Sequence, residues 1–147
     1  MTKLKDILYK TTINAVVGNT STDVNAISFD SRNLNKNDVF VAIKGTAVDG
    51  HSYINKAIEM GAIAIVCEIL PKNLIENITY VEVDNASSAL AFMASNYYHN
   101  PSENLKLIGV TGTNGKTTVA TLLYHQFKKA GYKVGLLSTV KIMVDSK

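Results

Sequence analysis

The sequence has one cysteine, two prolines, no tryptophan and no long apolar run. The single Cys67 cannot form an internal disulfide, which indicates a reducing compartment. The apolar run 62–67 around it favours a buried strand residue over a catalytic thiol. No stretch approaches the roughly 20 apolar residues of a membrane helix, and residues 1–6 lack the apolar core of a signal peptide. We therefore expect a cytoplasmic protein that does not enter a membrane.

Clustered positive charge is also missing. The formal net charge is only +3, Arg32 is the only arginine, and no basic stripe is interleaved with aromatic residues. Nucleic-acid binding needs such clusters, so we do not expect it. What the 147 residues do contain is 46% hydrophobic and 18% charged side chains, the composition of a globular protein with a core.

Two regions follow one another along the chain. Residues 1–100 mix β-branched or aromatic runs with helical periodicity, which predicts strands and helices. The expected strands are 25–29, 38–43, 62–67 and 78–83, and the expected helices are 52–60 and 87–98. Residues 101–104 follow Asn100 in a polar, proline-containing segment, and we interpret them as a linker between domains.

Residues 105–147 predict a strand at 105–110, a helix at 116–130 and a strand at 133–137. This order is typical of a βαβ unit in a parallel sheet. One such unit leaves sheet edges bare, so we expect this domain to be incomplete and the chain truncated. The predicted fold class is α/β: a small mixed α/β domain, followed by the first βαβ unit of a P-loop-type parallel-sheet ATPase domain.

A glycine-rich segment lies between the expected strand 105–110 and the expected helix. Gly112 and Gly115 allow close approach of backbone N–H groups to phosphate oxygens, reinforced by the helix dipole. Lys116 can reach the β- and γ-phosphates, and Thr117 can place its hydroxyl on Mg²⁺. The strict motif has glycine where this chain has Val110, but the strand before and the helix after favour a phosphate loop over a turn with a solvent-facing lysine. We predict binding of ATP with magnesium.

The segment 111–118 resembles the ATP loop of the Mur ligases and of their folylpolyglutamate synthetase relatives. Residues 29–32, 39–45 and 49–51 look like the N-terminal domain that the MurE and MurF types of this family share. Residues 98–105 and Thr113 are closer to the MurE type. The resemblance covers essentially the whole chain.

The resemblance implies an ATP-dependent ligase of peptidoglycan synthesis. Such an enzyme adds the third amino acid to UDP-N-acetylmuramoyl-L-alanyl-D-glutamate through an acyl phosphate, which turns a poor electrophile into a good one. Its partners would be this UDP-N-acetylmuramoyl-dipeptide and an amino acid, with a monomer as the expected oligomeric state. The acidic magnesium ligand, a carbamylated lysine and the C-terminal domain would lie beyond Lys147, so this chain alone should be inactive.

The same resemblance assigns site residues. Lys116 is the expected catalytic residue and Thr117 the expected metal ligand. The substrate's uridine diphosphate end is expected on Phe29, Ser31, Thr46, Ala47 and Val48. ATP is expected on Thr111, Gly112, Thr113, Asn114, Gly115, Lys116, Thr117 and Thr118.

Other interpretations of these residues remain open. From composition alone, residues 30–32 are a turn in which Asp30 and Ser31 bond local backbone and Arg32 is solvated. Asp49 and Gly50 predict an ordinary turn, and His51 the start of a helix. The whole protein could also be a MurF-type ligase that adds a dipeptide, or a nucleotide-sugar-binding module without turnover. The sequence does not distinguish lysine from diaminopimelate as the third amino acid.

Overall fold

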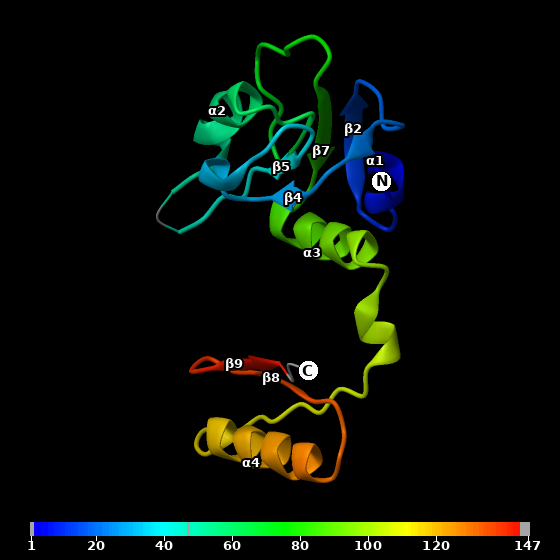
Figure 1. Cartoon of the computed structure of the whole chain (residues 1–147). Helices are drawn as coiled ribbons and strands as arrows, with labels where there is room; N and C mark the ends of the chain where they lie inside the picture. Colours follow the sequence, from blue (N-terminus) through cyan, green and yellow to red (C-terminus); the bar gives the residue numbers. More distant parts are fainter. Residues whose placement is uncertain (1, 47, 145–147) are drawn as a thin grey trace. The chain divides into compact units, whose positions relative to one another are not determined.

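The chain forms two compact units, Met1–Leu105 and Lys106–Lys147 (Figure 1). The structure is a computed structural model, and it describes residues 2–46 and 48–144. A 3₁₀ helix, η3 (Pro101–Asn104), occupies the segment predicted as a linker. The functional roles that the sequence suggests for the two regions remain predictions.

A five-stranded sheet forms the centre of the first unit, in the order β2-β7-β6-β5-β4. Four of its strands run parallel: β4 (Ile27–Ser28), β5 (Val39–Val41), β6 (Ala64–Cys67) and β7 (Thr79–Val83). At one edge β2 (Ile13–Val17) pairs antiparallel with β7. Two short strands, β1 (Thr2–Lys3) and β3 (Asp23–Val24), form a separate antiparallel pair.

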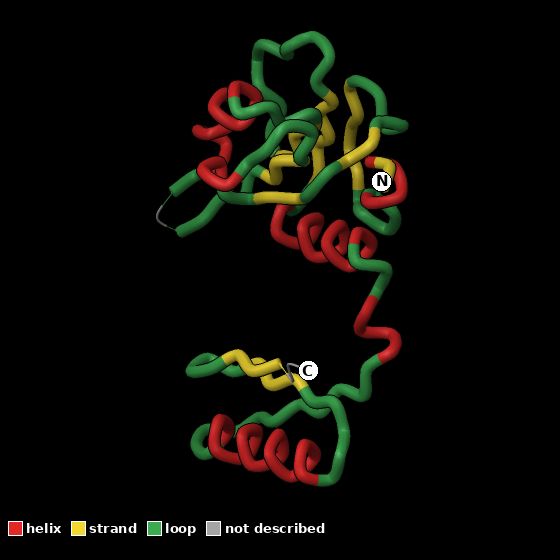
Figure 2. Tube along the Cα trace, in the orientation of Figure 1, coloured by secondary structure: helices red, strands yellow, loops and turns green. Residues whose placement is uncertain are grey.

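Helices cover both faces of this sheet, as Figure 2 shows. Side chains alternate along a strand, so Val39 and Val41 of β5 lie in one core and Phe40 in the other. The first core is closed by α1 (Leu4–Ile7) and α3 (Ala86–Tyr97), and the second by α2 (Ile54–Glu59). There are also two 3₁₀ helices. The first, η1 (Ser31–Asn33), follows β4, and the second, η2 (Gly50–Tyr53), directly precedes α2.

The predicted strands and helices of this unit are confirmed, with shorter bounds for all four strands and a 3₁₀ start to the helix expected at 52–60. Cys67 is fully buried on β6, as predicted. Burial and the nearby Glu82 carboxylate raise the pKa of its thiol to about 11, so the reactive thiolate is disfavoured.

The second unit contains α4 (Lys116–Lys129) and an antiparallel pair, β8 (Gly135–Leu137) with β9 (Ile142–Val144). Helix α4 is confirmed, and its buried Tyr124 lies with Leu136 of β8 in the core of this unit. The structure differs from the predicted βαβ unit: residues 105–110 form no strand, and the strand predicted at 133–137 is β8, which begins at Gly135 and pairs antiparallel with β9. A strand exists only where another strand accepts and donates its hydrogen bonds, and within the described residues no strand pairs with residues 105–110.

Among all residues that the structure describes, no helix combines the length and the apolar character that a membrane-spanning helix needs.

Candidate functional site

The glycine-rich loop enters α4 through backbone conformations that favour glycine. Gly112 has φ 144° and Gly115 has φ 76°, both in the region that side chains disfavour. Gly115 is the N-cap residue of α4, and no side chain caps that helix end. The first N–H groups of a helix have no partner inside it, and they carry the positive end of its dipole. This end of α4 therefore has the geometry of an anion-binding site.

Lys116 lies over the same loop. Its Nζ donates hydrogen bonds to the carbonyl oxygens of Gly112 and Thr113, the latter at 3.3 Å. Its side chain thus holds a positive charge close to the backbone that would surround a phosphate. Thr117, one residue further, is half-buried and lies on the first turn of α4.

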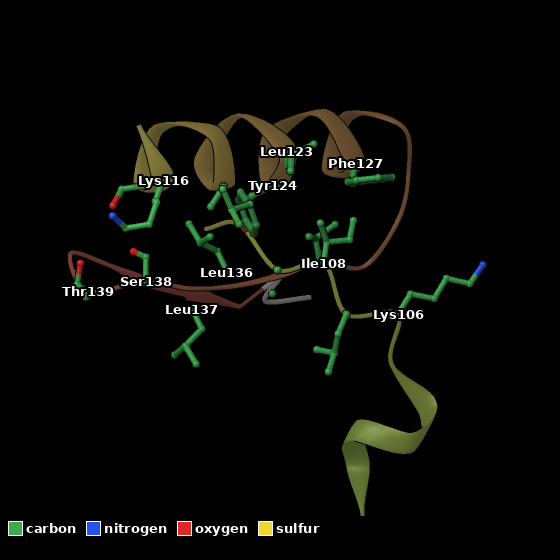
Figure 3. Close-up of a pocket in the computed structure, with 17 residues that line it drawn as sticks. Lys106, Ile108, Lys116, Leu123, Tyr124, Phe127, Leu136, Leu137, Ser138 and Thr139 are labelled. Atoms are coloured by element: carbon green, nitrogen blue, oxygen red, sulfur yellow. The ribbon is translucent and has the colours of Figure 1, made fainter. Parts of the chain in front are cut away.

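A hollow of about 470 Å³ runs between α4, β8 and residues 106–110. Figure 3 shows Lys116, Ser138 and Thr139 at one end of it and Ile108 and Phe127 toward the other. Lys116, Ser138 and Thr139 thus gather beside the loop, whereas Lys106 is drawn at the opposite end of the hollow (Figure 3). A phosphate group would fit the end of the hollow that carries Lys116.

Charge is distributed unevenly between the units. Residues 106–147 include a single acidic residue, Asp145, and these lysines: Lys106, Lys116, Lys128, Lys129, Lys133, Lys141 and Lys147. Such a segment attracts phosphate groups. This segment offers few ligands for Mg²⁺. Residues 106–144 contain no side-chain carboxylate, and Thr117 supplies a hard hydroxyl oxygen. No group of three His, Cys, Asp or Glu side chains that could hold a metal occurs among residues 2–46 and 48–144.

The residues predicted for the uridine diphosphate end follow two neighbouring strands. Phe29 and Ser31 come after β4, and Thr46 and Val48 lie in the loop after β5 (Figure 1). Ala47 lies outside the described residues. Because β4 and β5 are adjacent and parallel, both segments begin at the same carboxyl edge of the sheet, where α/β folds bind ligands. Phe29 is 65% exposed and Val48 54% exposed, so both side chains are accessible to a ligand.

The turn at residues 30–32 has the local backbone bond predicted for Asp30, but Arg32, predicted as solvated, is ion-paired with that carboxylate. The Asp30 carboxylate accepts from the backbone N–H of Arg32 at 3.0 Å and from its guanidinium Nε at 2.9 Å and terminal nitrogen at 2.7 Å. These bonds to Arg32 lower the pKa of Asp30 to about 2. Ser31 between them is 6% exposed, at the start of η1. Unlike Phe29 and Val48, Ser31 therefore exposes little of its surface to a ligand.

Comparison with known proteins identifies the family. Residues 23–98, about half of the chain, match the family described as Mur ligase family, catalytic domain, and residues 110–147 match the Mur ligase middle domain. The chain belongs to the Mur ligase family. The predicted resemblance is thereby confirmed.

Curated Mur ligases cover nearly all of this chain. A protein of Phocaeicola vulgatus is 50% identical over 143 residues, which are 97% of this chain and 30% of that protein. One of Cytophaga hutchinsonii is 49% identical over 146 residues, 99% of this chain and 30% of that protein. Both are named UDP-N-acetylmuramoyl-L-alanyl-D-glutamate–2,6-diaminopimelate ligase. The chain thus spans about 30% of the length of these relatives.

Solved Mur ligase structures resemble the fold. The MurF ligase of Thermotoga maritima, in complex with ADP, matches 72% of this chain and 24% of its own, with a TM-score of 0.55 and 32% identity. A structure of UDP-N-acetylmuramoyl-L-alanyl-D-glutamate–2,6-diaminopimelate ligase matches 97% of this chain and 28% of its own, with a TM-score of 0.68 and 19% identity. The α/β fold class predicted from the sequence is confirmed by this likeness.

One set of polar side chains in this Mur ligase chain was missed by the sequence reasoning. Asp49, His51 and Glu68 are joined by hydrogen bonds close to the loop after β5. The sequence suggested a turn at Asp49 and a helix start at His51, and both are present as the cap and first turn of η2. An Asp two residues before a His is a common sequence pattern. It does not indicate that Glu68 is the third residue of the set.

Proposed function

We propose that this chain is part of an ATP-dependent amide-bond ligase that adds diaminopimelate to UDP-N-acetylmuramoyl-L-alanyl-D-glutamate. The observation that carries the proposal is the 50% identity, across both units, with a relative named for that reaction. The MurF ligase of Thermotoga maritima is only 32% identical over a smaller part of the chain, which favours the MurE type over a dipeptide-adding enzyme. Because the chain spans about 30% of such relatives, the activity belongs to the whole protein.

The ATP site would be Thr111–Thr118. The ADP bound to the Thermotoga maritima relative supports nucleotide binding, and the two positive-φ glycines and the uncapped end of α4 support this place for it. Lys116 would exchange its hydrogen bonds to the Gly112 and Thr113 carbonyls for bonds to phosphate oxygens. Thr117 would supply one ligand to Mg²⁺, and the acidic ligands would come from the remainder of the protein.

The chemistry requires two displacements. An oxygen of the substrate carboxylate attacks the γ-phosphorus of ATP, and the bond from that phosphorus to the ADP oxygen breaks. The amine of the amino acid then attacks the carbonyl carbon of the acyl phosphate, loses a proton, and phosphate leaves with the electrons of the C–O bond. Lys116 would stabilise the negative charge on the transferring phosphoryl group, as a preorganised positive charge does.

The UDP end of the substrate would bind the first unit, at Phe29, Ser31, Thr46, Ala47 and Val48. The carboxyl edge shared by β4 and β5 supports this placement, since ligands bind outside the carboxyl ends of parallel strands. The buried, unreactive Cys67 is compatible with the cytoplasm as the compartment.

A ligation assay on the whole protein tests the proposal. It would be incubated with ATP, Mg²⁺ and UDP-N-acetylmuramoyl-L-alanyl-D-glutamate, together with either diaminopimelate or lysine. A separate reaction would contain ATP, Mg²⁺, the tripeptide-linked UDP-N-acetylmuramoyl substrate and D-alanyl-D-alanine. We expect a tripeptide product with diaminopimelate, and one ADP and one phosphate for each bond formed. Omission of each component in turn is the control. Faster turnover with lysine than with diaminopimelate would show that lysine is the amino acid added. Ligation of D-alanyl-D-alanine to the tripeptide-linked substrate would indicate a MurF-type enzyme. Binding without turnover would indicate a binding module.

A further inference from the structure

The loop after β5 is a narrow hairpin whose base is fixed against the sheet. Lys44 and Asp49 form an antiparallel bridge, and the Gly45 N–H donates to the Val48 carbonyl at 3.0 Å. Gly50 N–H donates to the Ile43 carbonyl at 2.9 Å. A Cβ on Gly50 would lie 2.6 Å from that carbonyl oxygen, so only glycine fits there. The tip of this hairpin carries Thr46 and Val48.

His51 ties the base of this hairpin to the next strand. Its Nδ1 lies 2.7 Å from the Asp49 carboxylate, which also accepts the His51 backbone N–H at 2.9 Å. Its Nε2 accepts the backbone N–H of Glu68 at 3.1 Å, directly after β6. Because Nε2 accepts, the ring proton is on Nδ1 and is donated to Asp49. The imidazole thus bridges the end of the hairpin and the carboxyl end of β6.

The connection continues to the third strand. The Glu68 carboxylate accepts the backbone N–H of Ala86 at 2.9 Å, in the first turn of α3 after β7. The hydrogen bonds therefore join the segments that follow β5, β6 and β7 at one edge of the sheet. Only 18% of the His51 side chain is exposed, whereas the hairpin tip is accessible, with Val48 54% exposed. This arrangement leaves the tip free for a ligand and fixes its base.

We propose that His51 is a positioning residue for the UDP-substrate loop 44–50, acting through Asp49 and the Glu68 backbone. The inference rests on the proposed function, since it requires that this loop contacts the substrate. A hairpin held at its base needs little ordering when the substrate binds, and preorganisation of this kind improves affinity. The substitution of His51 should therefore weaken substrate binding without affecting the separate ATP loop.

Calorimetric titration of the whole protein tests this inference. His51→Phe keeps a ring but removes both hydrogen bonds, and His51→Gln keeps a polar side chain; His125→Gln, an exposed histidine of α4, is the matched control. For His51→Phe we expect the Kd for UDP-N-acetylmuramoyl-dipeptide to rise about tenfold. The Kd for ATP should stay within about twofold. His51→Gln should lie between wild type and His51→Phe, and His125→Gln should match wild type.

Hydrogen exchange separates positioning from general loss of structure. In His51→Phe, amides of residues 44–50 should exchange faster and those of Ala64–Cys67 should not. An unchanged substrate Kd in His51→Phe, or equal weakening of both ligands, would overturn the inference. If the wild type binds the substrate but does not ligate it, the proposed ligase function fails while the binding comparison still decides the role of His51. If the wild type does not bind the substrate, the positioning role fails too.

Discussion

At the scale of single residues, Lys116 combines a fixed charge with a loop of positive-φ glycines. We predict that Lys116→Ala in the whole protein lowers kcat for ligation by about 10²–10³-fold, the usual loss when one preorganised charge partner of a transition state is removed. Lys129→Ala, at the other end of α4, is the matched control and should leave kcat unchanged. Circular dichroism should show both variants folded. Turnover close to wild type in Lys116→Ala would contradict the phosphate-loop assignment.

Gly115 is required for its backbone conformation and not for lack of space. A Cβ on Gly115 would meet no atom within 4 Å, and the same holds for Gly109, but only Gly115 has a positive φ. Gly115→Ala should lower the free energy of unfolding of the second unit by about 1–2 kcal/mol. It should also weaken ATP binding, whereas Gly109→Ala should change stability by less than about 0.5 kcal/mol. Urea denaturation and ATP titration of both variants would measure this, and equal effects would show that strain at Gly115 is not the cause.

Asp30 gives a pH-dependent prediction. Arg32 lowers its pKa from 3.8 to about 2, so the ionised form is favoured in the folded chain. A carboxylate whose pKa is depressed on folding stabilises the fold when the pH lies above its ordinary pKa. That contribution is lost as the pH falls from about 4 through about 2. In Arg32→Ala the pKa of Asp30 should rise toward its ordinary value. A carboxyl-carbon NMR titration would detect this, and an unchanged midpoint would show that the turn backbone alone sets the pKa.

At the scale of elements, the N-terminus of α3 is capped twice. The Asn85 side chain accepts the backbone N–H of Ser88 at 2.7 Å, and Glu68 accepts that of Ala86. Loss of such a cap typically costs about 1 kcal/mol. Asn85→Ala should therefore lower the free energy of unfolding by that amount in urea denaturation. Asn73→Ala, an exposed loop position, is the control, and the same loss there would assign the effect to something other than the cap.

Several elements could be predicted because their signals are local, whereas α1, β2 and the short strands β1, β3 and β9 were not predicted. The periodicity of α3 and α4 and the β-branched runs of β5, β6 and β7 are present in the sequence itself. Residues 105–110 show the limit, since their apolar run favours a strand but does not provide a partner for it. The site divides in the same way. Consecutive glycine, lysine and threonine predict a phosphate loop, whereas the His51 bond to Glu68 uses a backbone N–H that has no sequence signature.

At the scale of the whole chain, the two units differ in how completely their strands are covered. In the first unit both sheet faces have a core, and β6 is paired on both sides. In the second, one face of the β8–β9 pair is exposed, with Leu137 82%, Ile142 69% and Val144 76% accessible. Local opening costs least where backbone hydrogen bonds and buried apolar contacts are few. The units should therefore differ in local stability.

Hydrogen exchange of the 147-residue chain would test this difference. Amides of Leu105–Val110 should exchange far faster than those of Ala64–Cys67, because no strand of the described residues pairs with the first segment, whereas β6 lies between β5 and β7. ATP with Mg²⁺ should slow exchange at Thr111–Thr118 and leave residues 29–32 and 45–48 unchanged. UDP-N-acetylmuramoyl-dipeptide should slow exchange at residues 29–32 and 45–48 and leave Thr111–Thr118 unchanged. In the free chain, protection of Leu105–Val110 equal to that of β6 would mean that the segment has found a strand partner. A protection level that rises with chain concentration would identify that partner as a second copy, since pairing between chains follows mass action and pairing within one chain does not.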